Sequence, residues 1–223
     1  MAKAMTTSTI RGLTYWLRGN MYLSVTNQCN STSAIDLRGP SFVMPSHSNF
    51  SKLDEDITLP VTAELLAQAV EDAFNNEQIV VSSMDAAQIT FAGFGEPLLF
   101  PKLLCDAAVL IKENRHGVPL RIKTNGLIDP AVGLQVSTQL KESGFDKISI
   151  ALISDNPKQY ASIMQPTGNR TFSDVCCFVE SCVEVGLEVQ CTAVKMPEVN
   201  IKAVRALALS LGAIEFASAP YFP

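Results

Sequence analysis

The sequence predicts an α/β fold, a partial (β/α)6 TIM-like barrel in which parallel strands carry a ligand site at their carboxyl ends. Strand-like and helix-like apolar patterns alternate six times along the chain, as they do in proteins with a parallel sheet. The units follow one another without a long reversal, which favours a curled sheet with right-handed crossovers. Six strands are too few for an eight-strand barrel, so the barrel is expected to be partial.

Each element follows from its apolar pattern and from the residues at its ends. Strands are short runs of β-branched and other apolar residues, and helices have apolar residues spaced three or four apart. Thr62 is placed to cap the first helix, and Gly144, Gly186 and Gly212 follow the ends of later helices. The predicted strands are 21–26, 88–92, 120–123, 147–152, 187–194 and 213–216. The predicted helices are 62–74, 101–114, 130–143, 173–185 and 201–211, with a short helix near 157 and a turn-rich stretch over 27–60.

Composition and charge limit the class of protein. The chain of 223 residues is 47% hydrophobic and 17% charged, which fits a globular domain with a sizeable core. A net charge of −5 without a basic patch argues against a nucleic-acid binder. No apolar run reaches the ~20 residues that a membrane span needs. We expect an extension over 1–20, a barrel domain over 21–223 and a small-molecule ligand, with no nucleic acid or membrane; a protein partner is left open.

The N-terminal residues and the cysteines indicate in which cellular compartment the protein is expected. Lys3, Arg11 and Arg18 precede the first acidic residue, Asp36, which is weakly similar to a transit peptide. Residues 21–25 already have the pattern of a core strand, so a cytoplasmic protein is favoured. The six cysteines lack the spacing of a secreted disulfide framework, and free thiols in a reducing compartment are expected.

Polar residues follow the predicted strands at the points where the strands end. The second strand leads into Gly93-Phe94-Gly95-Glu96-Pro97, in which two glycines allow a tight turn and a close approach by a ligand. The third strand is followed by Thr124-Asn125-Gly126, and the fourth contains Ser149. Because the carboxyl ends of parallel strands meet at one edge of a sheet, we expect these groups to surround a small-molecule site.

This set of motifs resembles the radical S-adenosylmethionine (SAM) superfamily. The resemblance rests on motifs in the same order on successive strand ends: Tyr22-Leu23-Ser24-Val25-Thr26-Asn27-Gln28-Cys29-Asn30, Gly93-Phe94-Gly95-Glu96-Pro97, Thr124-Asn125-Gly126 and Ile148-Ser149-Ile150-Ala151-Leu152. Further along, Asn156-Pro157, Tyr160 and Gln165-Pro166 are similar to the TatD-associated branch of that superfamily.

The resemblance implies a SAM site at the carboxyl ends of the strands. The Gly95 backbone and the Glu96 carboxylate would bind the amino group of SAM. Thr124, Asn125 and Ser149 would lie near its ribose and carboxylate. The full set of cofactor-binding residues implied in this way is Gly93, Gly95, Glu96, Pro97, Thr124, Asn125, Ser149 and Val194, with the backbone around Val194 facing the adenine.

The superfamily's chemistry also needs a 4Fe-4S cluster, and here the sequence departs from the pattern. Three cysteines spaced C-x3-C-x2-C hold that cluster, because it takes soft thiolate ligands. Cys29 occupies the first position, whereas Ser33 and Asp36 stand at the second and third. The other cysteines have the pattern of core residues. The sequence therefore predicts a radical-SAM-related protein that keeps the SAM pocket, loses the cluster and performs no 5′-deoxyadenosyl radical chemistry.

Three other functions are left open by the sequence. One is an active radical SAM enzyme with an atypical 4Fe-4S site. Another is a Schiff-base or acid/base barrel enzyme with Lys123, Lys195 and Glu96 as catalytic residues, since lysines at strand ends can form Schiff bases. A third is a non-catalytic binding scaffold. Arg38, in the loop after the first strand, is either a fixed positive charge for an anionic ligand or a solvated loop residue.

Overall fold

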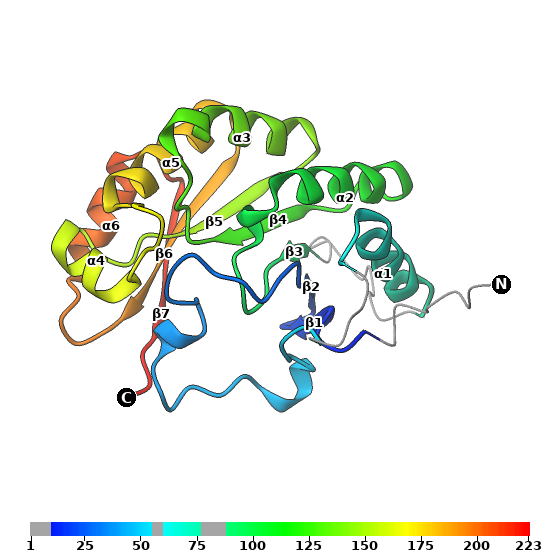
Figure 1. Ribbon diagram of the computed structural model, residues 1–223, viewed down its shortest axis with the longest axis horizontal. Helices are drawn as coiled ribbons and strands as arrows, with labels where there is room; N and C mark the ends of the chain where they lie inside the picture. Colours follow the sequence, from blue (N-terminus) through cyan, green and yellow to red (C-terminus); the bar gives the residue numbers. More distant parts are fainter. Residues whose placement is uncertain (1–9, 55–59, 77–87) are drawn as a thin grey trace.

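The computed structural model describes residues 10–54, 60–76 and 88–223, and it contains a seven-stranded sheet in the order β1-β2-β3-β4-β5-β6-β7 (Figure 1). β1 runs antiparallel to β2, and each later pair of neighbours is parallel. The helices arch over one face of the curled sheet, which confirms the predicted α/β partial barrel.

The described strands are β1 (Thr14–Leu17), β2 (Asn20–Leu23), β3 (Ile89–Phe91), β4 (Leu120–Thr124), β5 (Lys147–Ala151), β6 (Glu188–Lys195) and β7 (Glu215–Pro220). The described helices are α1 (Ala63–Asn75), α2 (Pro101–Asn114), α3 (Pro130–Glu142), α4 (Pro157–Met164), α5 (Phe172–Glu184) and α6 (Ile201–Ser210). Three short 3-10 turns are η2 (Asp36–Arg38), η3 (Ser46–Ser48) and η4 (Pro97–Leu99). Every predicted strand and helix is present, and the last strand begins two residues later than expected.

β1 was not predicted from the sequence. This strand has four residues, too few to show a period of two, and it lies in the stretch of residues 1–20 that was set apart as an extension. Arg18 and Gly19 connect it to β2 with φ angles of 53° and 77°. A two-residue turn with both φ values positive matches the twist of an antiparallel hairpin. β1 therefore adds an antiparallel edge to the parallel sheet.

The two faces of the sheet differ in chemistry. Ile89, Ile122, Ile150 and Val189, from four neighbouring strands, are fully buried beneath the helices. The alternate residues leave the sheet on its concave face, because successive side chains of a strand point to opposite faces. In the middle of the sheet these residues are mainly polar: Thr90, Arg121, Lys123, Ser149, Gln190 and Thr192. The concave face is therefore suited to a polar ligand.

The helix ends follow the predicted local rules. The Thr62 side chain accepts a hydrogen bond from Leu65 N at 3.2 Å and begins α1. Thr171 and Asp174 form a reciprocal capping box at the start of α5. Gly144 follows α3 with a φ of 98°, a left-handed conformation that glycine adopts without steric cost. These local signals position the strand-to-helix turns from which the site is built.

A long loop crosses the open side of the sheet from β2 toward β7 and returns to β1 (Figure 1). Phe222 N donates to the Arg38 carbonyl at 2.8 Å, and Arg38 Nε donates to the Pro220 carbonyl at 2.9 Å. The Arg38 guanidinium lies 4.3 Å from the centroid of the Phe42 ring. Arg38 is thus a partly buried residue that joins the loop to the segment after β7.

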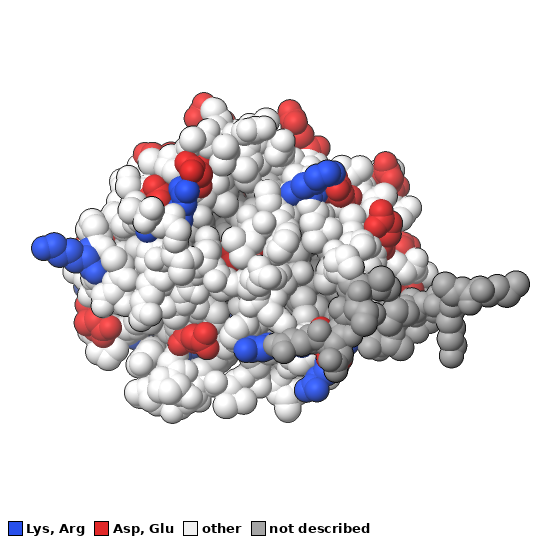
Figure 2. All heavy atoms as spheres, in the orientation of Figure 1, with Lys and Arg blue, Asp and Glu red and all other residues white. Residues whose placement is uncertain are grey.

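No helix within the described ranges is both long enough and apolar enough to span a membrane. On the face shown in Figure 2, positive and negative side chains are interspersed around the edge and no large basic patch forms. This face lacks the clustered positive charge with which proteins bind a nucleic-acid backbone.

Candidate functional site

A pocket lies at the carboxyl ends of β2, β3 and β4, under the long loop. Its volume of about 160 Å³ has room for on the order of ten water molecules, so it is a ligand-sized cavity and not a packing defect. One wall is mainly apolar and comes from β1, β2 and the loop: Tyr15, Leu17, Tyr22, Leu37, Phe42 and Met44. The rest of the lining is mainly polar and comes from the β3 and β4 ends: Gly93, Gly95, Glu96, Lys123, Thr124 and Asn125.

The structure brings together most of the residues that the sequence singled out. Cys29, Gly95, Glu96, Thr124 and Asn125, from three separate strand ends, line this one pocket, as do Gly93 and Lys123. Four others lie outside its lining. Pro97 begins η4, the Ser149 hydroxyl donates to Gln190 Oε1 at 2.9 Å, Val194 is buried within β6, and Lys195 is exposed at the end of that strand. Of the two lysines considered for Schiff-base chemistry, Lys123 alone faces the pocket.

Glu96 joins the β3 loop to the β4 loop. Its Oε1 accepts hydrogen bonds from Leu98 N at 2.8 Å and from the Thr124 hydroxyl at 2.7 Å, and its Oε2 accepts one from Asn125 N at 2.7 Å. Burial raises the pKa of the Glu96 carboxyl to about 7, although the three donors oppose this shift. A carboxylate has about four acceptor positions. One position therefore remains for a ligand that lies against the pocket wall.

Gly95 is required by a close approach of two loops. A Cβ at this position would lie 2.3 Å from the Gln28 carbonyl oxygen and 2.5 Å from that of Thr26. Gly95 N donates to the Thr26 carbonyl at 3.1 Å, and Glu96 N donates to the Gln28 carbonyl at 2.8 Å. From the sequence, this glycine was expected to make room for a ligand. In the structure its missing side chain also makes room for the segment that leads to Cys29.

The cluster positions do not form a set of iron ligands. All six cysteines lie in described residues, and Cys29 is the one that lines the pocket. Ser33 is buried, its hydroxyl donates to Asp36 Oδ2 at 2.8 Å, and Asp36 N donates to Ser33 Oγ at 3.1 Å. Among the described residues no three His, Cys, Asp or Glu side chains are arranged as a metal site. One thiol and a hydrogen-bonded hydroxyl–carboxylate pair do not fit a cluster that needs three thiolates.

Cys29 lies in a polar surrounding. Its Sγ is 3.8 Å from Ser31 Oγ and 3.9 Å from Asn125 Nδ2, both within hydrogen-bonding range for sulfur. Burial is the largest influence on the thiol, and it raises the pKa of Cys29 above its ordinary value. A raised pKa keeps the side chain in the neutral thiol form, which is the weaker nucleophile and metal ligand.

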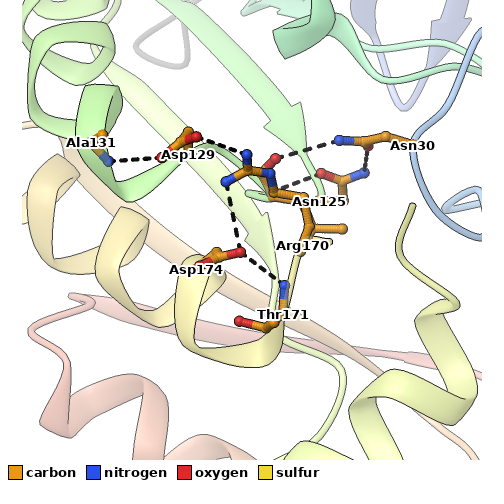
Figure 3. Close-up of polar contacts among 8 residues, drawn as sticks. Asn30, Asn125, Asp129, Ala131, Arg170, Thr171 and Asp174 are labelled. Carbon is orange, nitrogen blue, oxygen red and sulfur yellow. Dashed lines mark hydrogen bonds and ion pairs between the residues drawn. The ribbon is translucent and has the colours of Figure 1, made fainter. Parts of the chain in front are cut away.

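Asn125 connects this loop to the rest of the rim. Its Nδ2 donates to Asn30 Oδ1 at 2.6 Å (Figure 3). The same nitrogen donates to Ser31 Oγ at 2.9 Å. The side chain that was predicted to contact SAM therefore also positions the residues next to Cys29.

An ion-pair group lies beside this network. Arg170 NH2 is 2.8 Å from Asp129 Oδ2, and Arg170 NH1 is 3.9 Å from Asp174 Oδ2 (Figure 3). The hydrogen bond from Arg170 holds the pKa of Asp129 below its ordinary value. Sequence reasoning missed this group because Arg170 and Asp129 are 41 residues apart and share no motif.

The apolar wall of the pocket was not predicted from the sequence either. The Tyr15 and Tyr22 rings are stacked with centroids 4.8 Å apart, and the Phe50 ring meets Tyr15 edge-on at 5.0 Å. Tyr22 lies in the predicted strand over 21–26, whereas Tyr15 and Leu17 belong to β1, which was not predicted. Met44 and Phe42 lie in the turn-rich loop, whose path no local pattern indicates.

Comparison with known proteins bears on the class of protein. No family model matches the chain. Over 128 residues it is 33% identical to the GTP 3',8-cyclase of Corynebacterium glutamicum, and the match covers 55% of this chain and 32% of that enzyme. The enzyme of strain R of the same species matches equally, at 33% over 127 residues, 55% of this chain and 31% of the relative. The chain thus spans about a third of the length of the curated relatives it matches.

Solved structures share the fold. Methylornithine synthase (PylB) aligns with a TM-score of 0.58 at 12% identity, over 91% of this chain and 53% of that one. TYW1 with a lysine–pyruvate adduct bound aligns with a TM-score of 0.59 at 11% identity, over 99% of this chain and 70% of that one. HydG, a maturase of the [FeFe]-hydrogenase, aligns with a TM-score of 0.59 at 13% identity, over 91% of this chain and 42% of that one. The chain therefore shares its curled-sheet fold with these three proteins.

Proposed function

We propose that this protein is a radical-SAM-related protein of the TatD-associated type that binds SAM, or a similar nucleoside ligand, without a standard 4Fe-4S cluster. The observation that carries the proposal is the convergence of Gly93, Gly95, Glu96, Thr124 and Asn125 on one pocket beside Cys29. The placement in the TatD-associated branch rests on Asn156-Pro157, Tyr160 and Gln165-Pro166, which build and end α4. Ser33 and Asp36 support the loss of the cluster, because they stand where two thiolates would be needed and are hydrogen-bonded to each other.

Glu96 gives the proposed site a defined preference for a cationic group. SAM carries an ammonium group, and the fourth acceptor position of the Glu96 carboxylate is suited to bind it. The glycines beside Glu96 expose backbone at the pocket wall, and Thr124 and Asn125 add polar groups at the β4 end. The chain's own residues thus bind and orient the ligand. If a cluster were bound, it would supply the electron that cleaves SAM, and the residues present do not fit it.

SAM affinity is expected to rise with pH between about 6 and 8. The pKa of Glu96 is about 7 in the free protein, and the ammonium group of SAM binds the ionised carboxylate best. Below pH 7, binding should therefore release a proton. Calorimetry in two buffers of different ionisation enthalpy measures both effects. In Glu96→Gln the affinity should be weak and independent of pH over this range; the same pH dependence in that variant would contradict the assignment to Glu96.

Anaerobic iron–sulfur reconstitution is expected to leave the protein without a stable cluster. Cys29 alone cannot hold a 4Fe-4S cluster, because three of its irons need a thiolate each. The measurements are iron per chain and the visible absorbance near 400 nm. Cys29→Ser should bind as little iron as the native protein. About four irons per chain in the native protein, lost in Cys29→Ser, would establish an active enzyme with an atypical cluster instead.

A further inference from the structure

The segment that contains Cys29, residues 29–32, is hydrogen-bonded to the end of α4 and to the turn that follows it. Thr32 donates from its backbone N and from its hydroxyl to the last two carbonyls of α4, at 2.7 and 3.0 Å. Thr167 donates from its N and from its hydroxyl to the Asn30 carbonyl, at 2.8 and 3.2 Å. The bonds to Thr32 also provide partners for helix-end carbonyls that lack one within the helix. They fix the Cys29 segment on both sides of Ser31.

The turn between α4 and α5, residues 165–171, has a backbone that needs support. Gln165, Gly168 and Asn169 have φ angles of 46°, 66° and 60°. Side-chain-bearing residues adopt this left-handed conformation at a cost, and it persists where surrounding contacts hold it in place. Arg170 N donates to the Thr167 carbonyl at 3.3 Å. Arg170 therefore lies at the point where the turn can be anchored.

Arg170 joins this turn to the start of another helix. Its NH2 is 2.8 Å from Asp129 Oδ2, and its NH1 is 3.9 Å from Asp174 Oδ2. Asp129 also caps α3, since its Oδ1 accepts a hydrogen bond from Ala131 N at 3.0 Å (Figure 3). Asp174 belongs to the capping box of α5. The guanidinium thus links the first turns of α3 and α5 through their capping carboxylates.

These contacts form a closed ring. Leu127, two residues before Asp129, donates from its N to Asn125 Oδ1 at 3.0 Å, and its carbonyl accepts a hydrogen bond from Asn30 Nδ2 at 3.4 Å. Asn125 in turn donates to Asn30. The ring passes through Asn30, Thr167, Arg170, Asp129, Leu127 and Asn125. It connects the loops that follow β2 and β4 with the turn after α4.

We propose that Arg170 is a positioning residue of the pocket, whose ion pair with Asp129 closes the ring that holds Cys29 and Asn125 at the pocket wall. Cys29 and Asn125 line the pocket, whereas Arg170 lies outside its lining and acts through them. The ion pair is partly exposed, at 26% for Arg170 and 49% for Asp129. Because exposed pairs add little to global stability, its loss should alter the Cys29 segment more than the fold as a whole.

The test measures how fast iodoacetamide alkylates Cys29 in the folded protein, with tryptic peptides analysed by mass spectrometry. Cys29 is the one cysteine of peptide 19–38, and Cys105 is the one cysteine of peptide 103–112, so each rate is read separately. In Arg170→Gln the rate at Cys29 should rise at least threefold, because the segment is held less firmly. Cys105 lies in α2, outside the ring, and should react at its native rate.

A double-mutant cycle tests whether Arg170 acts through Asp129. Asp129→Asn removes the ion pair and keeps a residue that can cap α3. It should raise the rate at Cys29 as much as Arg170→Gln does, and the double variant should add nothing further. Arg170→Lys keeps a positive charge and should restore most of the native protection. SAM affinity should fall three- to tenfold in Arg170→Gln, an expectation that rests on the proposed function.

Lys147→Gln is the matched control, because it breaks a 3.0 Å ion pair with Glu188 at the amino ends of β5 and β6, away from the pocket. Its Cys29 should react at the native rate. The proposal is overturned if Cys29 in Arg170→Gln reacts at the native rate, if Cys105 accelerates equally, or if Lys147→Gln has the same effect. If the native protein does not bind SAM and Arg170→Gln still exposes Cys29, the proposed function fails and the positioning role stands.

Discussion

Replacing Glu96 with alanine is expected to lower the free energy of unfolding by roughly 3–5 kcal/mol. The side chain is almost completely buried and accepts three hydrogen bonds, from Leu98 N, Asn125 N and the Thr124 hydroxyl. Its removal leaves three buried donors unpaired, and each costs about 1–3 kcal/mol. The loss is large compared with the ~5–15 kcal/mol that stabilises a typical domain. The same change should abolish SAM binding, since it separates the two loops that form the polar wall.

Urea unfolding measures this effect. Asp106→Ala is the matched control, because it also truncates a carboxylate, here one in an exposed ion pair with Lys102 at 2.7 Å. Exposed pairs contribute little to stability, so the control should unfold as the native protein does. Equal unfolding midpoints for Glu96→Ala and Asp106→Ala would show that Glu96 does not hold the two loops together.

The pKa of Glu96 also gives the protein a characteristic pH dependence. The folded-state pKa of about 7 lies above the ordinary 4.5, so the folded state binds more protons than the unfolded state between these values. The contribution of Glu96 to stability therefore falls as the pH rises from about 4.5 to about 7, and it is constant above that. The change is on the order of 3 kcal/mol. It should appear as the difference between the native protein and Glu96→Gln, because the other carboxyls titrate equally in both.

Gly95→Ala is expected to have the second large effect, a destabilisation of roughly 1–3 kcal/mol or more. The new Cβ would lie within 2.8 Å of three backbone atoms, in Thr26, Asn27 and Gln28. Backbone cannot move aside as the end of a flexible side chain can. The segment that leads to Cys29 must therefore shift, and SAM affinity should fall at least tenfold.

Gly117→Ala is the control for this change, because a Cβ at Gly117 would meet no atom within 4 Å and its φ is not in the left-handed region. Its stability and SAM affinity should match those of the native protein. Thermal unfolding and calorimetry on the two variants make the comparison. If Gly95→Ala binds SAM as tightly as Gly117→Ala, the contact between the two loops does not shape the pocket.

The loop after β2 has Ser33 and Asp36 at two of the three positions where the cysteine motif would supply cluster ligands. Ser33 and Asp36 are three residues apart, at the spacing at which a serine hydroxyl caps a following turn. Their mutual hydrogen bonds lie at the start of η2, and neither side chain supplies the thiolate that the cluster needs. Sequence reasoning identified both substitutions, because the spacing from Cys29 is visible in the chain. It could not show that the two replacement residues bond to each other.

Other features of the site were beyond the reach of sequence reasoning. The contact of Arg38 with Pro220 and Phe222 joins residues more than 180 positions apart. Tyr15 and Leu17 belong to a strand of four residues, which is too short for its period to be recognised.

By itself, the sequence determined the alternation of strands and helices, the helix caps and the polar residues at the strand ends. These depend on apolar periodicity and on side chains bonding to nearby backbone, both of which act over a few residues. The tertiary structure alone decided which strand ends share one pocket, that Glu96 accepts hydrogen bonds from three donors, and that the long loop joins the segment after β7. Those outcomes depend on burial and on pairing between distant segments, because only the packed chain excludes water from a carboxylate or brings a second backbone against a glycine.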